Sequence, residues 1–386
     1  MAGEDRLWNW QGQGSRRKAV YQVIVGGEDI TPRLDPHLIS LNVTDKEDSI
    51  DKCAIELDDR DAKLMIPPDA APIEVWLGWH TEGMYQVFEG LVDSVESGFG
   101  RKQGGRRLWI DASGTAMKSH VKSPMTMTWG EGAPPGSSQG NTIPLKQVLE
   151  EAAKKAGLSA KISSQLGGLK RDFWHMGNES FQNFGQRLAR ELGGVFKISG
   201  GKASLTSATD YTNVDGEKLD AIIAEWGKNL IAWRIKPYAG RPQYKEAAAH
   251  FYDLQKSIFD KVTKGIGGAG PFGAAEAIAA LPMMAPNKQV GEQTNAGLDA
   301  DSTRRRGTGW VQLNGEPLAR AGSPLTIIGA RPGVDGTYRI EEAEHTYSRR
   351  GGYLTRCTVN NPAFPQPYTP DWPHPGQPQT PPPPAG

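Results

Sequence analysis

The stretch of sequence that decides the fold begins with Ile73-Glu74-Val75-Trp76-Leu77-Gly78. It continues with Gly-Leu-Val-Asp-Ser-Val-Glu-Ser at 90–97, a turn rich in glycine and arginine, and Leu-Trp-Ile at 108–110. A similar series returns late in the chain, as 325–329, 336–345, a turn at 349–352, and 353–359. A series that occurs twice predicts two units of one design in this chain.

Short strand-like runs surround the first series. Turn signals such as Gly26-Gly27-Glu28-Asp29 and Pro67-Pro68 separate them. So many short strands in about a hundred residues indicate a barrel or a sandwich. Together with the repeat, they predict a first β-barrel domain over residues 19–113. The expected strands are 19–25, 38–44, 52–58, 73–79, 85–97 and 107–112.

The second series belongs to a longer region in which strand-like and irregular stretches alternate. We expect a second β-barrel domain over 208–360, interrupted near 265–290 by a mobile insertion or loop rich in Gly, Ala, Pro and Met. One short helix is expected at 292–306. The expected strands begin near Ala221 and include 229–238, 247–253 and 257–263, with others between 310 and 360.

Two amphipathic helices are predicted between the two barrels. In the first, Thr142 is the expected cap, and apolar residues recur at helical spacing from Leu145 to Ala156. In the second, Asn178 is the expected cap and the apolar stripe runs from Phe181 to Leu192. Each helix leads into strand-like residues. This pattern predicts a small α+β domain over 142–207, joined to the first barrel by a linker at 114–141.

The composition excludes several classes of protein. The 386 residues contain 44 Lys plus Arg and 44 Asp plus Glu, so no net charge draws the chain to nucleic acid or an anionic membrane. With 47 Gly, 28 Pro and 37% hydrophobic residues, turns and short strands are favoured over an all-α fold. Cys53 and Cys357 are too few for a disulfide framework. Two buried thiols in a reducing compartment are expected, with a bridge between them left open.

The two ends of the chain differ in amino-acid composition from its centre. Residues 1–18 carry Trp8, Trp10 and a basic run without strand or helix period, and we expect a flexible arm there. Residues 361–386 form a Pro-rich tail, for which a docking role and an inert role both stay open. No signal-peptide pattern and no run of about 18 apolar residues is visible, so neither Sec export nor stable membrane insertion is expected.

Two short motifs match catalytic or cofactor patterns, but each has the wrong context. The stretch 265–270 fits the dinucleotide fingerprint G-x-G-x-x-G, yet a polar segment precedes it and Pro271 follows it. The stretch 136–140 fits the nucleophile elbow G-x-S-x-G, yet Pro134 and Pro135 stand where a central strand is needed. We interpret the first as a flexible loop and the second as a linker.

The remaining polar clusters also predict no site. The seven histidines are scattered without zinc-ligand spacing, and Asp58-Asp59-Arg60-Asp61 lacks the alternation of a calcium loop. We expect a solvated turn there. Glu341, Glu342 and Glu344 are interpreted as a solvent-facing or interfacial strand, and the basic turns as solvated loops, with charge lining a DNA channel as the exception. Those basic turns are Arg101, Lys102, Arg106, Arg107, Arg304 to Arg306, Arg349 and Arg350. No catalytic, cofactor-binding or metal residue is predicted.

Several segments, in their order, resemble the phage late control gene D proteins. The resemblance runs from about residue 19 to residue 360, and it depends on the order in which the segments occur along the chain. The segments are 25–31 (VGGEDIT), 40–45 (SLNVTD), 51–59 (DKCAIELDD), Leu77-Gly78, 179–189 (ESFQNFGQRLA), 315–318 (GEPL), Gly322, Gly336-Thr337-Tyr338 and 345–355 (HTYSRRGGYLT).

That resemblance implies a structural baseplate hub of a contractile-tailed phage, related to the first part of type VI secretion spikes and without catalytic residues. It implies a mainly β fold with α+β character, in which two tube-type barrels flank a small α+β domain. Such hubs are homotrimers that adapt a six-fold tail tube to a three-fold spike. The implied partners are tube and spike proteins, other baseplate proteins, the tape measure, and DNA in transit through the channel. The implied location is the virion tail baseplate, after assembly in the host cytoplasm.

Two rival functions remain open from the sequence. One is a tail-associated enzyme that degrades cell wall, which would be expected to show an added domain with placed carboxylates or a Cys/His pair. The other is a spike component of a secretion or tailocin-type injection system, which a C-terminal β-helix repeat would favour. The sequence shows neither feature. The Trp-bearing arm, the 265–290 insertion and the Pro-rich tail depart from the family pattern.

Overall fold

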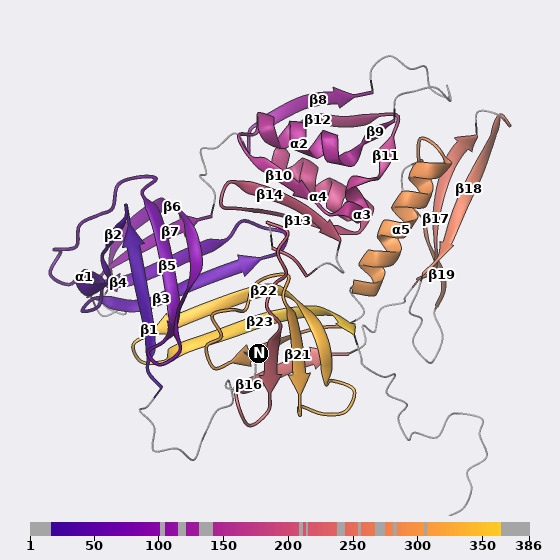
Figure 1. Ribbon diagram of the computed structural model, residues 1–386. Coiled ribbons are helices and arrows are strands. Elements are labelled where there is room, and N and C mark those ends of the chain that lie inside the picture. The colour runs from indigo at the N-terminus through magenta and orange to yellow at the C-terminus, as the bar shows by residue number, and fades with distance from the viewer. Residues whose placement is uncertain are drawn as a thin grey trace, which may run out of the picture.

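A computed structural model shows a mainly β protein built from one large sheet, an α+β unit and an inserted unit (Figure 1). The structure describes residues 17–100, 105–114, 121–130, 142–207, 211–213, 215–237, 244–253, 256–266, 275–280, 284–304 and 307–363. Most of the arm at 1–18, most of the Pro-rich tail and the motif at 136–140 lie outside the described residues. The mainly β class expected from the sequence is confirmed.

The first half of the large sheet contains the strands that precede the helices. Its hydrogen-bonded order is β3-β4-β7-β6-β5-β1-β2, and consecutive neighbours are antiparallel. The short helix α1 (Thr31–Leu34) follows β2. The strands are β1 (Ala19–Val25), β2 (Glu28–Asp29), β3 (Leu38–Lys46), β4 (Lys52–Asp58), β5 (Pro72–Trp79), β6 (Gly83–Gly100) and β7 (Gly105–Ser113).

The second half repeats the strand order of the first. Its order is β16-β20-β23-β22-β21-β15, so each strand from β3 to β1 has a counterpart in the same place. One pairing differs, because β15 runs parallel to β21 whereas β1 runs antiparallel to β5. The strands are β15 (Ile222–Glu225), β16 (Leu230–Lys236), β20 (Thr308–Leu313), β21 (Pro324–Ile328), β22 (Gly336–Ser348) and β23 (Gly352–Ala363).

The two halves are joined into one 13-stranded sheet by the pairing of β22 with β3. Each half rolls around its own core, but the described strands do not complete a ring of hydrogen bonds. Strand β1 pairs only with β2 and β5, and β3 pairs only with β4 and β22. The described strands therefore form no closed barrel, and the two expected β-barrel domains are not confirmed. The strand β3 that could have closed the first half pairs instead with the second half.

Side-chain alternation explains why both halves roll. In β5, Ile73, Val75 and Leu77 are buried while their neighbours face outward, as the period of two in a strand requires. The first core gathers residues from β1 and β3 to β7, together with Tyr353 from β23. The second core gathers residues from β15, β16 and β20 to β23. Cys53 and Cys357 are free thiols, each buried in a different one of these cores.

The α+β unit (121–207) packs two main helices on short strands around a third core. Helix α4 begins after Ser180, whose Oγ accepts a hydrogen bond from Asn183 N at 3.2 Å. The expected cap Asn178 instead lies at a bulge of β12 with φ +46°. Helix α2 begins after Pro144 without a side-chain cap, so Thr142 does not cap it. The elements are β8 (Pro124–Trp129), β9 (Ile143–Pro144), α2 (Leu145–Lys155), β10 (Ser159–Ile162), α3 (Ser164–Gly167), β11 (Lys170–Arg171), β12 (Trp174–Ser180), α4 (Phe181–Leu192), β13 (Gly194–Ser199) and β14 (Lys202–Ser207).

The inserted unit interrupts the second half between β16 and β20. It is a three-stranded sheet, ordered β18-β17-β19, with helix α5 against it. The region expected to be an insertion or loop at 265–290 therefore includes a strand and the start of a helix. Its elements are β17 (Tyr244–Asp253), β18 (Ile258–Gly265), β19 (Ala275–Ala280) and α5 (Lys288–Arg304).

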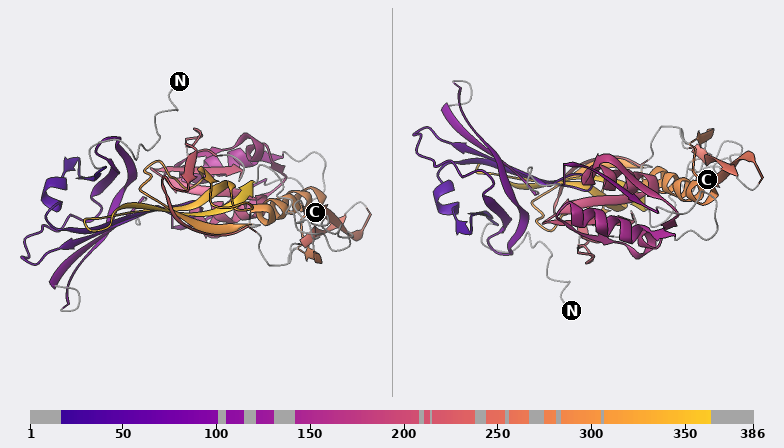
Figure 2. Two further views of the ribbon diagram at one scale, coloured as in Figure 1. Left: turned by 90° about the horizontal axis from the view of Figure 1, so that it is seen from below. Right: turned by 90° about the horizontal axis from the view of Figure 1, so that it is seen from above.

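The views of Figure 2 show an elongated molecule. The first half of the sheet and the inserted unit lie at opposite ends, with the second half and the α+β unit between them. Within the described ranges, no helix has both the length and the apolar character to cross a membrane.

Candidate assembly site where the units meet

The loop between β20 and β21 (314–323) fastens the two sheet halves to each other. Trp79 of the first half donates from its indole Nε1 to the carbonyl of Gly315 at 2.9 Å and packs on Tyr353, with ring centroids 5.9 Å apart. Gly315 has φ +44°, and a Cβ there would lie 2.5 Å from the Tyr353 ring, so only glycine fits. Arg17 stacks on the outer side of Trp79 at 3.9 Å and pairs with Glu82 at 2.6 Å.

A buried histidine completes this joint. His345 has no exposed surface; its Nδ1 accepts a hydrogen bond from the Tyr353 hydroxyl at 2.8 Å, and its Nε2 donates to the carbonyl of Ala319 at 3.1 Å. Burial, helped by the nearby charge of Arg320, lowers the pKa of His345 to about 3. The ring therefore stays neutral near pH 7, and both of its nitrogens are used to hold the loop against β22 and β23.

A second joint is built from charges, and most of its acids come from one short turn. The end of β3 and the turn that leads to β4, which we together call the acidic turn (45–51), supply three carboxylates. Lys197 of β13 is bound by Asp45 and lies 3.4 Å from Asp51. Asp51 also accepts from Ser199 Oγ at 3.1 Å, and Asp45 accepts from the backbone N–H of Ala321 at 3.1 Å. The acidic turn thus holds the α+β unit and the second half together.

The third carboxylate of the acidic turn binds arginines. Glu47 is 3% exposed and accepts a hydrogen bond from Nε of Arg339, a β22 residue that is only 1% exposed. Its other oxygen has no hydrogen bond and faces Arg304 of α5 at 3.9 Å. The six charged residues form what we call the ionic junction: Asp45, Glu47, Asp51, Lys197, Arg304 and Arg339.

The carboxylates of the ionic junction have different pKa values for physical reasons. Burial raises the pKa of Asp51 to about 7, because Lys197 offsets the loss of water only in part and Asp45 repels the second negative charge. Burial acts against Asp45 as well, but Lys197 and Arg320 hold its pKa below the usual range. Burial also raises the pKa of Glu47 despite Arg339. A cavity of 210 Å³ lies among these side chains.

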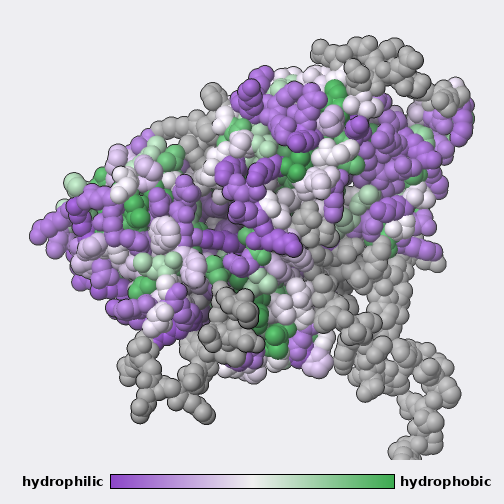
Figure 3. Space-filling model, in the orientation of Figure 1, coloured by the Kyte–Doolittle hydropathy of each residue, from purple (hydrophilic) through white to green (hydrophobic). Residues whose placement is uncertain are grey.

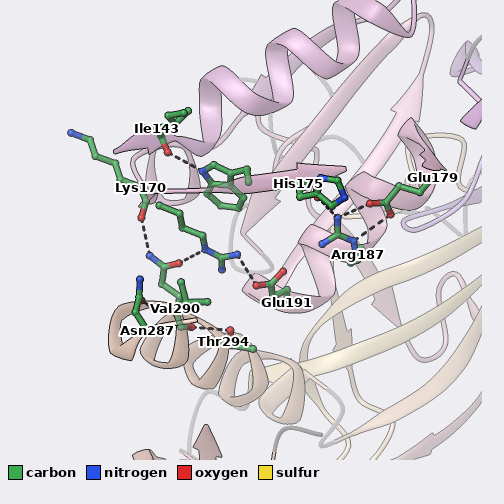
Figure 4. A network of polar contacts seen from close by, with 12 residues as sticks. Ile143, Lys170, His175, Glu179, Arg187, Glu191, Asn287, Val290 and Thr294 are labelled. Atoms are coloured by element: carbon green, nitrogen blue, oxygen red, sulfur yellow. Dashed lines mark hydrogen bonds and ion pairs between the residues drawn. The ribbon is translucent and has the colours of Figure 1, made fainter. Parts of the chain in front are cut away.

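The inserted unit is fixed to the α+β unit by a polar network and a close helix contact (Figure 4). Arg171 pairs with Glu191 at 2.7 Å and donates to the Gln293 side chain at 2.9 Å. Gly297 of α5 lies so close to the end of α4 that a Cβ there would be 2.2 Å from the Glu191 carbonyl. Elsewhere in the figure, Arg187 reaches Glu179 at 2.6 Å.

The outer surface offers small apolar groups. On the face shown in Figure 3, hydrophilic residues dominate and apolar ones occur in separate patches. Met65 (85%), Ile66 (64%) and Phe99 (70%) are among the most exposed large apolar side chains, and their segments meet where Asp59 N bonds the Arg106 carbonyl at 3.1 Å. A second group lies on the second half, at Trp226 and Ile328. Apolar groups of this kind are typical of contact sites with other proteins.

Several residues weighed in the sequence as possible sites have structural contacts. Asp59 is buried and caps its own turn, accepting from Lys63 N at 3.1 Å. Glu342 pairs with Lys46 across the joined halves at 3.5 Å, which fits an interfacial strand. Gly265 ends β18, which is paired antiparallel to β17, and 267–270 lie outside the described residues.

Sequence reasoning missed the ionic junction. The described ranges contain no group of three or more His, Cys, Asp or Glu side chains that could hold a metal ion. The junction uses acids that the sequence analysis treated only as part of a family resemblance. The available signal was the density of acids in 45–51, Asp-Lys-Glu-Asp-Ser-Ile-Asp, directly after a strand. The basic partners Lys197, Arg304 and Arg339 are distant in sequence and carry no such signal.

Known proteins similar to this chain were found by sequence and by structure. No family model matches the sequence. Curated relatives named probable baseplate hub protein occur in Escherichia phage 186, 23% identical over 205 residues, and in Escherichia phage P2, 24% identical over 212 residues. The chain is similar in sequence to these baseplate hub proteins over part of its length. The match covers 53% and 54% of the chain, and about half the length of each of those hub proteins (49% and 50%).

Several solved structures share the fold of this chain. The 43 kDa tail protein of prophage MuSo2 from Shewanella oneidensis covers 89% of this chain and 98% of its own, with TM-score 0.61 and 15% identity. A tail protein from Neisseria meningitidis covers 89% and 96%, with TM-score 0.62 and 13% identity. The E. coli c3393 protein, a type VI secretion component, covers 92% and 76%, with TM-score 0.51 and 9% identity. At these identities the likeness to the solved structures is one of fold.

Proposed function

We propose that this protein is a structural baseplate hub of a contractile phage tail, which trimerises and adapts a six-fold tail tube to a three-fold spike. The observation that carries the proposal is the strand order that occurs twice in the large sheet. Two units of one design in one chain are what such an adaptor requires. The role is structural and involves no catalysis.

A trimer of this chain would present six similar sheet halves around its axis. Closed homo-oligomers repeat one interface around an axis, so three copies of this chain present three first halves and three second halves. Because the halves share a strand order, they approximate six equivalent positions around a ring. A six-fold tube can then contact six similar surfaces, while the α+β and inserted units, present once in each chain, keep the three-fold repeat that a trimeric spike needs.

The construction of the sheet also suits this role. A hydrogen-bonded ladder from β22 to β3 and the buried Trp79 contact fix the two halves to each other. A ring that transmits force needs units of constant spacing. The exposed apolar group at Met65, Ile66 and Phe99 then offers a contact for a tube or neighbouring subunit at the outer end of the first half.

The assignment as a baseplate hub also suggests domain boundaries, partners and a location. The division into domains at 19–113, 142–207 and 208–360 is retained, with a linker, an arm and a tail outside them. Tube proteins would bind one side of the ring and the spike the other, with other baseplate proteins and the tape measure as further partners and DNA in transit. The protein would act in the virion tail baseplate after assembly in the host cytoplasm.

A second candidate is a spike component of a secretion or tailocin-type injection system. The fold shared with the E. coli c3393 protein favours it. Both candidates use the same ring, and they differ in what passes through it. Partner identity therefore distinguishes them better than the fold does.

The test is native mass spectrometry of the purified full chain, alone and with its tube and spike partners. The proposal predicts a species of three times the 41.9 kDa chain mass that binds both partners. A chain that stays monomeric even with the spike present would contradict it. The matched variant is Phe99→Asp, which should weaken tube binding while leaving the trimer mass unchanged if that end contacts the tube.

A further inference from the structure

The α+β unit meets the sheet through charges, whereas each unit is held together internally by an apolar core. The described residues form four separate hydrophobic clusters, and none of them includes residues from both the α+β unit and the sheet. The contact between these two bodies depends instead on the ionic junction and on polar bonds such as Gln186 Nε2 to the Asp48 carbonyl, at 2.6 Å. A buried ion pair adds little net stability compared with apolar contact, because both charges lose their water.

The inserted unit moves with the α+β unit if either moves. Arg171 and Gln293 bond the two units, and α4 and α5 are in close contact through Gly297. Arg304 of the inserted unit reaches the acidic turn, where its Nη1 lies 3.9 Å from Glu47, and α5 also contacts β23 of the sheet. Two bodies can therefore be recognised: the sheet on one side, and the α+β unit with the inserted unit on the other.

The centre of the contact is a triad of Asp45, Lys197 and Asp51. Two carboxylates and one ammonium carry one excess negative charge, and this charge is buried. If one carboxyl keeps a proton, the triad is neutral and Lys197 still has an ionised partner in Asp45. The 210 Å³ cavity beside the triad has room for several waters at about 30 Å³ each, through which a proton can leave.

We propose that the α+β unit and the inserted unit rock as one body against the sheet, and that the Asp45–Lys197–Asp51 triad is the latch that holds the contact closed while one of its carboxyls stays protonated. Loss of that proton places a second buried carboxylate beside the single ammonium of Lys197. The contact then opens to bring water to it. The latch is a property of this chain alone and does not depend on its place in a baseplate.

The groups around Asp51 give the direction of the effect. Asp45 faces it from β3, Lys197 and Ser199 from β13, and Arg320 lines the same cavity from the loop before β21. The pKa of Asp51 is raised to about 7 in the closed state, against an ordinary value of 3.8. A group with a raised pKa stabilises the closed state at low pH and loses that contribution as the pH rises through the raised value. That contribution is lost between the ordinary value of 3.8 and the raised value near 7, so the contact is closed at pH 5 and loosened at pH 8.

The experiment measures the distance between the two bodies by electron spin resonance on the full chain. Spin labels are placed at Arg33→Cys in α1 and Lys146→Cys in α2, where the side chains are 65% and 63% exposed. Cys53 and Cys357 are buried and do not take the label. Labelled protein is diluted with unlabelled chain, so that only distances within one chain contribute.

The expected result is a narrow distance distribution at pH 5 that broadens and shifts as the pH rises and changes no further above about pH 7. Asp51→Asn, which mimics the protonated carboxyl, should keep the narrow distribution at both pH 5 and pH 8. The matched control Lys202→Met removes an exposed lysine of the same unit, paired with Asp215, and should behave as the natural chain. Identical distributions at both pH values in the natural chain, or a shift that persists in Asp51→Asn, would overturn the latch.

Discussion

The two joints made by the large sheet are built on opposite principles. Between the halves, a strand ladder, a glycine that only just clears two aromatic rings and a neutral histidine give a dry, close-packed contact. Between the sheet and the α+β unit, six charged side chains surround a cavity. The comparison shows that burial alone does not decide how firmly two units are held. Buried apolar contacts exclude water, whereas buried charges can exchange their partners for water.

The strongest test of this contrast is Trp79→Ala. The side chain is 5% exposed, and its removal leaves a cavity between the halves and an unpaired carbonyl at Gly315. We expect a loss of about 3–5 kcal/mol in the free energy of unfolding, measured in urea at fixed protein concentration. Trp226→Ala is the control, because that indole is 55% exposed and its loss should cost about 1 kcal/mol or less. Equal losses would remove the distinction between a packed joint and the surface.

The charged joint is tested by Glu47→Gln. The amide keeps the shape of the carboxylate but removes the negative charge that Glu47 places against the buried Arg339, and we expect a loss of about 2–3 kcal/mol. Glu342→Gln removes a partly exposed acid that pairs with Lys46 on the same sheet. That control should change the urea midpoint by less than about 1 kcal/mol. If the two variants are equally stable, the ionic junction does not hold the units.

The two joints should also respond to pH in opposite directions. His345 has a pKa of about 3 in the folded chain, below its ordinary value of 6.5, so the unfolded chain binds more protons in between. Stability is therefore lost on acidification below pH 6.5, by about 1.4 kcal/mol for each pH unit. His345→Gln should remove this slope in urea unfolding between pH 6.5 and 4.5. A slope that is unchanged in the variant would assign the acid sensitivity to other groups.

The smallest expected loss of stability comes from a helix cap. It distinguishes the cap seen in the structure from the caps expected from the sequence. Ser180→Ala removes the side chain that accepts from Asn183 N and should cost about 1 kcal/mol. Thr142→Ala, at the expected cap that α2 does not use, should leave the thermal midpoint unchanged. The reverse pattern would mean that the helices begin where the sequence suggested.

Local features of this fold were predictable from the sequence, and long-range pairings were not. Alternation predicted strands such as 73–79, and the duplicated series predicted that β5 to β7 and β21 to β23 share an order. Which distant strand edges meet was not predictable from local patterns: β3 pairs with β22, and the two expected β-barrel domains are not confirmed. Asn178 was a plausible cap by residue type, but its backbone lies in a bulge with positive φ.

The ionic junction was also not predictable from the sequence. Four acids within 45–51 are visible in the sequence, but a charged turn is usually a solvated one. The burial of those in the ionic junction follows from the approach of β13 and β22, which no local pattern records. Lys197 and Arg339 each lie in a strand whose neighbours are apolar, and such isolated charges in buried strands are the signal that could have pointed to partners elsewhere.

The central claim is that one chain carries two equivalent sheet halves so that three chains can meet a six-fold tube. The most direct test is electron cryomicroscopy of the purified assembly viewed end-on, with no symmetry imposed. The account predicts a ring around an open channel with six similar lobes at the level of the sheet and three at the level of the α+β and inserted units. A particle without a ring, or a ring whose lobes number the same at both levels, would contradict it.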